Sequence, residues 1–210
     1  GADIITASAG TSNFRAGVNA GNSIASGGNY NVVVGDEAGT AITTGDENTF
    51  VGYTAGDAVT TASANTGVGY AALSANTSGT QNSAFGNRAG DAITTGDGNT
   101  AIGYFSLSTT TTADNNTAVG VDSLGINSTG ADNTAIGKDA LRANTTASNN
   151  TAVGSSALVA NTTGAQNTAV GYQAASALTT GANIVAIGYQ AGNALTTGEN
   201  NIAIGKNALG

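Results

Sequence analysis

Histidine, cysteine, methionine, tryptophan and proline are all absent from the 210 residues of this sequence, and only 9% of its residues are charged. Without cysteine the chain has no disulfide framework, and its redox compartment cannot be inferred. Histidine and cysteine supply many nucleophiles, general bases and metal ligands. We therefore expect no catalysis and no cofactor.

Positive charge is also scarce, with five Lys and Arg against thirteen Asp and Glu and a net charge of −8. That balance argues against nucleic acid and anionic lipid as partners. No segment approaches the roughly 18 apolar residues of a membrane span, so we expect no membrane insertion by this segment. A signal-peptide pattern is also missing, which suggests a mature or excised piece.

What the sequence does contain is a repeat anchored on glycine, in units such as Asn-Thr-Ala-Val-Gly. The anchor glycines recur at intervals of 17 residues: Gly35, Gly52, Gly69, Gly86, Gly103, Gly120, Gly137, Gly154, Gly171, Gly188 and Gly205. A further unit begins at Gly17. We therefore divide the chain into a non-repeat segment, 1–16, and a repeat region, 17–210.

Each unit contains short strand-like stretches separated by Gly, Asn and Asp, which favour tight turns and positive φ. No stretch has the length and periodicity of a helix. We therefore predict an all-β fold, a parallel β-solenoid of about twelve 17-residue coils stacked at the strand spacing of about 4.8 Å.

Two positions in the repeat vary together. Where the fourth residue after the anchor is Leu, as at Leu158, the seventh is polar, as at Asn161; where the fourth is Ala or Gly, as at Ala175, the seventh is aliphatic, as at Leu178. We interpret the two positions as alternative ways of filling one core slot, because two large side chains would overpack it and none would leave a void.

The strand alternates between two faces, with Thr and Val on one and Ala and Gly on the other. We expect the Val/Ile column to form the core: Val51, Val68, Ile102, Val119, Ile136, Val153, Val170, Ile187 and Ile204. The opposite column, which includes Ala118, Ala135 and Ala152, is flat and small. We expect a second chain to pack on it, which favours a homo-oligomer.

The stretches NIVAIG (183–188) and NNIAIG (200–205) resemble the head repeats of YadA-like trimeric autotransporter adhesins, and similar repeats occur in phage tail fibres. The resemblance covers about residues 30–210. It implies a left-handed parallel β-roll, three chains side by side and an extracellular place on a cell surface or virion. The 17-residue unit is longer than the family's usual one.

Four asparagines begin Asn-x-Ser/Thr, the acceptor pattern for N-glycosylation: Asn76, Asn127, Asn144 and Asn161. Asn115 and Asn149 do the same. The alternative is that stacked Asn and Thr side chains hydrogen-bond along a ladder, and the sequons are then a by-product of a Thr-rich repeat.

Three further columns each allow two interpretations. Acidic residues in the turns, such as Asp46, Asp97 and Asp114, suit either solvated turns or calcium. Tyrosines on adjacent units, such as Tyr53 and Tyr70, suit either an aromatic ladder or a surface that binds glycans. One Thr column suits ice binding: Thr43, Thr60, Thr77, Thr94, Thr111, Thr145, Thr162, Thr179 and Thr196.

Together these patterns predict a structural subunit of an extracellular fibre, either the shaft or head of an adhesive fibre or a self-assembling filament. The alternatives are a receptor-binding phage tail-fibre shaft and an ice-binding solenoid. A terminal coil leaves an open strand edge. We therefore expect Ile4 and Ile5, within residues 3–6, to contact a neighbouring subunit and cover its last coil.

Overall fold

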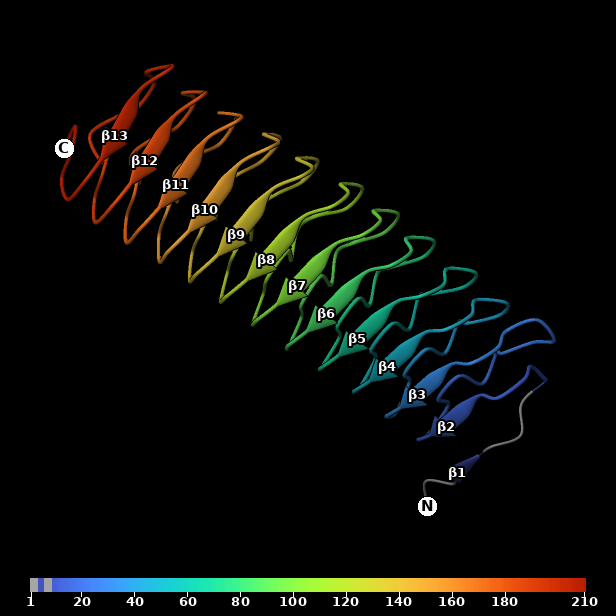
Figure 1. Ribbon diagram of the computed structural model, residues 1–210. Helices are drawn as coiled ribbons and strands as arrows, with labels where there is room; N and C mark the ends of the chain where they lie inside the picture. Colours follow the sequence, from blue (N-terminus) through green and yellow to red (C-terminus); the bar gives the residue numbers. More distant parts are fainter. Residues whose placement is uncertain (1–3, 6–8) are drawn as a thin grey trace.

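The protein is a rod of stacked coils, seen in a computed structural model that describes residues 4–5 and 9–210 (Figure 1). One short strand from each coil contributes to a single sheet that runs the whole length of the rod, and the first and last strands lie at opposite ends of it. Among the described residues there is no helix, so the expected all-β class is confirmed.

The sheet contains thirteen strands in sequence order. They are β1 Ile4–Ile5, β2 Phe14–Ala16, β3 Val32–Val34, β4 Thr49–Val51, β5 Thr66–Val68, β6 Ser83–Phe85, β7 Thr100–Ile102, β8 Thr117–Val119, β9 Thr134–Ile136, β10 Thr151–Val153, β11 Thr168–Val170, β12 Val185–Ile187 and β13 Ile202–Ile204.

Strands β2 to β13 are all parallel and in register, so each residue pairs with its equivalent in the next repeat, as Thr117 does with Thr134. The predicted β-solenoid with a 17-residue coil is therefore confirmed. At the spacing of parallel strands, the eleven steps from β2 to β13 give a rod about 50 Å long.

The repeat begins earlier than expected. Phe14 pairs with Val32 in the parallel stack, so residues 14–16 belong to the first coil and not to the non-repeat segment 1–16. Before them, β1 pairs antiparallel with β2 of the same chain, Ile4 opposite Ala16. The contact with a neighbouring subunit expected for Ile4 and Ile5 stays a prediction, and Asp3 and Thr6 lie outside the described residues.

The anchor glycines make the first corner after each strand. Gly120 has φ +136°, a conformation that residues with a β-carbon rarely adopt. A β-carbon there would also lie 2.6 Å from the carbonyl oxygen of Gly137 in the next coil. The 17-residue glycine spacing therefore follows from the close contact between successive corners.

The Val/Ile column does not form the core, so that prediction was wrong. The third residue of each strand points out of the rod: Ile102, Ile136 and Ile187 are 39–40% exposed, and Ile204 is 65% exposed. The middle residue points inward, and Ala118, Ala135 and Ala152 are completely buried. The predicted alternation between two faces of the strand is correct, but the face predicted to point inward points outward.

The reason is the narrow interior. Each coil already places one large aliphatic side chain from the corner, such as Leu124 or Leu141, opposite the strand, and both are completely buried. The strand can therefore add only a methyl group. Val33 and Phe50 are the exceptions, and each fits because glycines stand beside it. A β-carbon at Gly39 would lie 2.7 Å from Val33, and one at Gly67 would lie 3.0 Å from the Phe50 ring.

The shared core slot is confirmed. Leu158 and Asn161 are buried together in one coil, and Ala175 and Leu178 in the next. The backbone at the fourth position is left-handed in both coils, with φ +52° at Leu158 and +49° at Ala175. Glycine is thus the residue that adopts the backbone conformation of the fourth position most easily. Leucine occupies this position in the coils whose seventh residue is polar, because the slot then needs a large apolar side chain from the fourth position.

We predict strong coupling between these two positions. Ala175→Leu alone should overpack the slot against Leu178, and Leu178→Asn alone should leave a void, each lowering the free energy of unfolding by about 1–3 kcal/mol. The double variant should recover most of that loss, as urea unfolding and a double-mutant cycle would show. Additive losses would contradict the shared slot.

Candidate functional site

The interior offers no space for a ligand. The described part of the chain contains no pocket, and it contains no group of three His, Cys, Asp or Glu residues placed to hold a metal ion. No helix in this part has the length and hydrophobicity of a membrane span. Candidate sites are therefore restricted to the polar ladders and the outer faces of the rod.

A buried asparagine ladder runs beside the sheet, and the sequence reasoning missed it. The asparagine before each strand is inside the rod: Asn13, Asn31, Asn48, Asn65, Asn82, Asn99, Asn116, Asn133, Asn150 and Asn167. At Asn133, the backbone N–H and Nδ2 both donate to Oδ1 of Asn116, at 3.0 and 3.1 Å, and Nδ2 also donates to the carbonyl oxygen of Ala147 at 2.8 Å. The sequence signal that could have revealed this ladder is the asparagine that begins units such as Asn-Thr-Ala-Val-Gly.

This ladder joins successive coils, because the Oδ1 of one asparagine accepts from the backbone N–H of the next, as Asn133 Oδ1 does from Asn150. Most of the Nδ2 groups donate to a carbonyl oxygen of the following coil, and many also donate to the preceding Oδ1. Only Ile184 interrupts it, and there the backbone N–H still donates to Oδ1 of Asn167 at 2.9 Å. The role of the column is to satisfy buried backbone groups at the turn before the strand.

We predict that Asn133→Ala lowers the free energy of unfolding by at least about 2 kcal/mol, because it leaves the backbone N–H of Asn150 buried without its acceptor, takes one acceptor from Asn150 Nδ2 and removes one of the two donors to the Ala147 carbonyl. The exposed Asn87→Ala is the matched control and should change stability by less than about 0.5 kcal/mol. Thermal and urea unfolding measure both. An equal effect of the two substitutions would refute the ladder's contribution.

The four predicted glycosylation sites are buried. Asn76, Asn127, Asn144 and Asn161 are all 0% exposed. Asn127, Asn144 and Asn161 form the ladder that was the alternative interpretation, for example from Asn144 Nδ2 to Asn127 Oδ1 at 2.9 Å, whereas Asn76 bonds Gly79 within its own turn. In the folded protein they are therefore not acceptors. Asn115 and Asn149 remain exposed.

The acidic turn residues bond the backbone of the preceding coil. Asp97 Oδ1 accepts from the N–H and hydroxyl of Thr80 at 2.6 and 3.0 Å, and Asp114 Oδ1 accepts from the N–H of Asp97 at 2.8 Å. These carboxylates therefore act as hydrogen-bond acceptors in the turns, and their positions are explained without a bound calcium ion.

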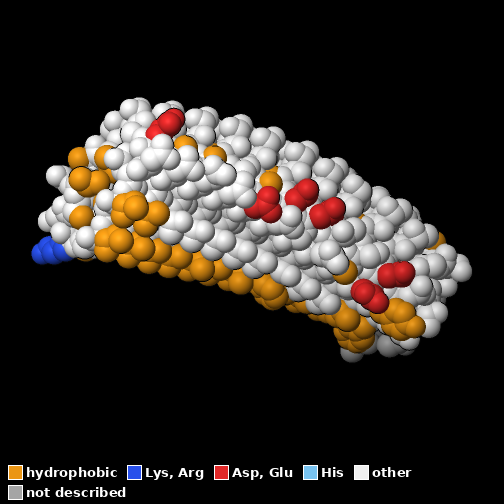
Figure 2. Space-filling model, turned by 45° about the horizontal axis from the view of Figure 1, so that its top comes forward, with side chains coloured by type: hydrophobic (Ala, Val, Ile, Leu, Met, Phe, Trp, Pro, Cys, Tyr) orange, Lys and Arg blue, Asp and Glu red, His pale blue; other side chains and the backbone are white. Residues whose placement is uncertain are grey.

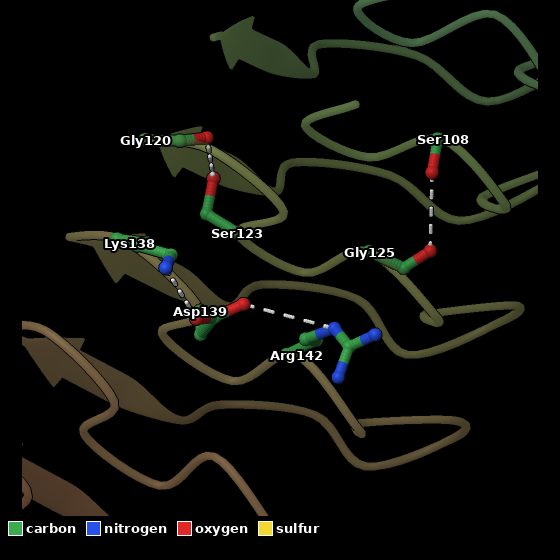
Figure 3. Close-up of polar contacts among 7 residues, drawn as sticks. All are labelled: Ser108, Gly120, Ser123, Gly125, Lys138, Asp139 and Arg142. Carbon is green, nitrogen blue, oxygen red and sulfur yellow. Dashed lines mark hydrogen bonds and ion pairs between the residues drawn. The ribbon is translucent and has the colours of Figure 1, made fainter. Parts of the chain in front are cut away.

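Polar contacts on the surface near the middle of the rod are weak (Figure 3). Asp139 lies 3.8 Å from Lys138 Nζ and 3.7 Å from Arg142 Nε, and both basic side chains are more than half exposed. Ion pairs of this kind contribute little to stability. Ser123 caps its own corner by donating to the Gly120 carbonyl at 3.0 Å.

Two carboxylates are held in less polar surroundings. Burial raises the pKa of Asp91, although Arg88 at 3.9 Å opposes that shift, and one Asp91 oxygen is buried without a hydrogen-bond partner. Burial also raises the pKa of Asp57, to which the charge of Glu37 adds. Both groups hold a proton more tightly in the folded than in the unfolded chain.

We predict that these residues make the protein more stable in acid. A carboxyl whose folded pKa is raised contributes stability below its ordinary pKa of about 4 and loses it as the pH rises through the folded value. The stability gained by Asp91→Asn should therefore be larger at pH 7 than at pH 3. Urea unfolding across this range measures the difference, with Asp57→Asn as an independent case of the same sign. A gain that grows toward low pH would contradict the assignment.

The tyrosines form stacked pairs on the outside. The rings of Tyr53 and Tyr70 are 5.8 Å apart, and those of Tyr172 and Tyr189 are 5.5 Å apart, both nearly parallel. The rings cover each other's inner faces, as the aromatic-ladder interpretation predicted. A sugar would find only the outer face of each pair.

The Thr column proposed for ice binding is tied to the backbone. Thr60, Thr94 and Thr162 each donate their hydroxyl to a carbonyl oxygen 17 residues onward, at 3.0–3.2 Å. Thr43, Thr77, Thr145 and Thr179 do the same, so seven of the nine hydroxyl groups in this column link one coil to the next.

The remaining candidate is the outer sheet face, which we define as the first and third residues of β3 to β13. The first residue is Thr or Ser in eight of these eleven strands. The third is aliphatic or aromatic in all of them: Val34, Val51, Val68, Phe85, Ile102, Val119, Ile136, Val153, Val170, Ile187 and Ile204. Figure 2 shows hydrophobic side chains in a band along one long side of the rod.

The expected contact through Ala118, Ala135 and Ala152 was wrong, because these side chains are inside the coil and cannot reach another chain. Comparisons of the chain with models of protein families, with curated proteins and with solved structures find no match.

Proposed function

We propose that the protein is a non-catalytic structural element of an extracellular fibre, a stiff spacer that sets distance and presents a repeated surface. The observation that supports this most directly is the unbroken parallel register of β2 to β13. Each coil bonds mainly to the coils before and after it, so length is the property that the repeat controls.

The resemblance to YadA-like head repeats and phage tail-fibre repeats adds the finer parts of the proposal. These are a left-handed coil, three chains per fibre and a place on a cell surface or virion. An adhesive shaft and a receptor-binding tail-fibre shaft both require the same rod.

The spacer role predicts that whole coils can be removed. Deleting residues 120–136 joins Val119 to Gly137 and keeps every column in register, so the chain should fold to a rod about 4.8 Å shorter. Deleting only residues 120–127 shifts all later columns and should abolish cooperative unfolding. Circular dichroism and small-angle X-ray scattering measure fold and length.

If the 17-residue deletion unfolds the protein as completely as the shorter one, the coils are not independent spacers. If the scattering of the full chain is that of a compact globule, the spacer proposal fails altogether.

A further inference from the structure

We infer that the outer sheet face binds the surface of ice crystals. The inference goes beyond the proposed spacer role, because it assigns this face a ligand, which is a lattice of ordered water. The Thr column that the sequence suggested for ice is a different one, and most of its hydroxyl groups bond the neighbouring coil, as at Thr60. The structure directs attention to the sheet instead.

The outer sheet face presents two parallel columns of side chains. They lie on one face because the first and third residues of each strand point outward, whereas the middle residue is buried. From β7 to β11 every strand reads Thr-Ala-Val or Thr-Ala-Ile, so five threonines stand beside five Val or Ile side chains. This section is the most regular part of the face.

The hydroxyl groups of the first column are not used within the chain. The column comprises Thr49, Thr66, Ser83, Thr100, Thr117, Thr134, Thr151 and Thr168. Among the residues that the structure describes, none is a hydrogen-bond partner of these eight hydroxyl groups. In the other Thr column the hydroxyl of Thr145 donates to the carbonyl oxygen of Thr162 at 3.1 Å. The hydroxyl groups on the sheet are therefore free to bind water.

The two columns repeat with the regularity of a lattice. In-register pairing places Thr117 beside Thr134 and Val119 beside Ile136, and the strand spacing sets each step at about 4.8 Å. The water molecules of hexagonal ice repeat along one crystal axis at a distance close to this spacing. Because Thr, Val and Ile are all β-branched and stiff at χ1, their hydroxyl and methyl groups keep the same positions from coil to coil.

The chemistry of the two columns suits ordered water. A threonine hydroxyl both donates to and accepts from water, whereas the methyl groups of Val and Ile restrict the orientation of the water around them. A charged side chain would instead hold a hydration shell of its own, and the outer sheet face has no charged residue from Val32 to Ile204. Hydrogen-bonding anchors and water-ordering methyl groups thus lie in one fixed array.

A second copy of the chain is the competing occupant. The residues that dominate protein interfaces are enriched in Trp, Tyr and Arg, while Ser, Thr and Val are under-represented among them. The section from β7 to β11 contributes only Thr, Val and Ile to the outer sheet face, and the aromatic Phe85 lies one strand before it. This composition favours ice over a protein partner.

The test measures thermal hysteresis of freezing and inhibition of ice recrystallisation by the full chain, with ice itself as the probe. The wild type should be active in both assays. Thr134→Tyr raises a ring above the middle of the regular section and should remove most of the thermal hysteresis. Thr129→Tyr, at an exposed turn before the same strand, is the matched control and should keep the wild-type value.

A second substitution guards against misfolding. Val119→Tyr raises a ring at the third position of β8, in the other column, and should remove the thermal hysteresis in the same way. Both substituted side chains point away from the core, so circular dichroism and small-angle X-ray scattering of the variants should match the wild type. The loss of activity is then measured on a folded rod.

A folded wild type without thermal hysteresis, or folded Tyr variants of this face that retain it in full, would overturn the inference. Sedimentation measures the particle mass, and a mass above 20.1 kDa that Thr134→Tyr reduces to one chain would assign the face to a second copy instead. Scattering from an intact rod in any of these cases would leave the proposed spacer role standing.

Discussion

The alignment of each coil on its neighbour is the constraint on which the rest of the structure depends. A single 17-residue coil buries too little apolar surface to be stable, so stability arises between coils. Buried asparagines enforce the alignment: Asn133 contacts the coil before it through Asn116 and the coil after it through Ala147. A slip of one residue would leave all these groups without partners.

This constraint explains the unusual composition. The closely spaced corners require glycine, as at Gly120, and the narrow interior admits mostly alanine from the strand, as at Ala118. Thr60 and the acidic turn residue Asp97 satisfy backbone groups of adjacent coils with short polar side chains. Large side chains are then confined to one slot per coil and to the outer sheet face.

The described residues of the rod enclose no pocket, and the function we propose uses its length and its outer faces. The ladders and stacked tyrosines mostly link coils within one chain. The outer sheet face differs, because its third-position side chains remain partly exposed, as at Ile136, which is 40% exposed. That difference separates groups that build the rod from groups free to meet a partner.

The sequence by itself determined the coil length, the parallel stack and the exchange between Leu158 with Asn161 and Ala175 with Leu178, because these are periodic and compensating properties of one chain. It did not determine which strand face points inward, because alternation defines two faces without naming the inner one. Only the tertiary structure decided that, since the corner leucine already fills the interior and leaves space for Ala135 but not for Ile136.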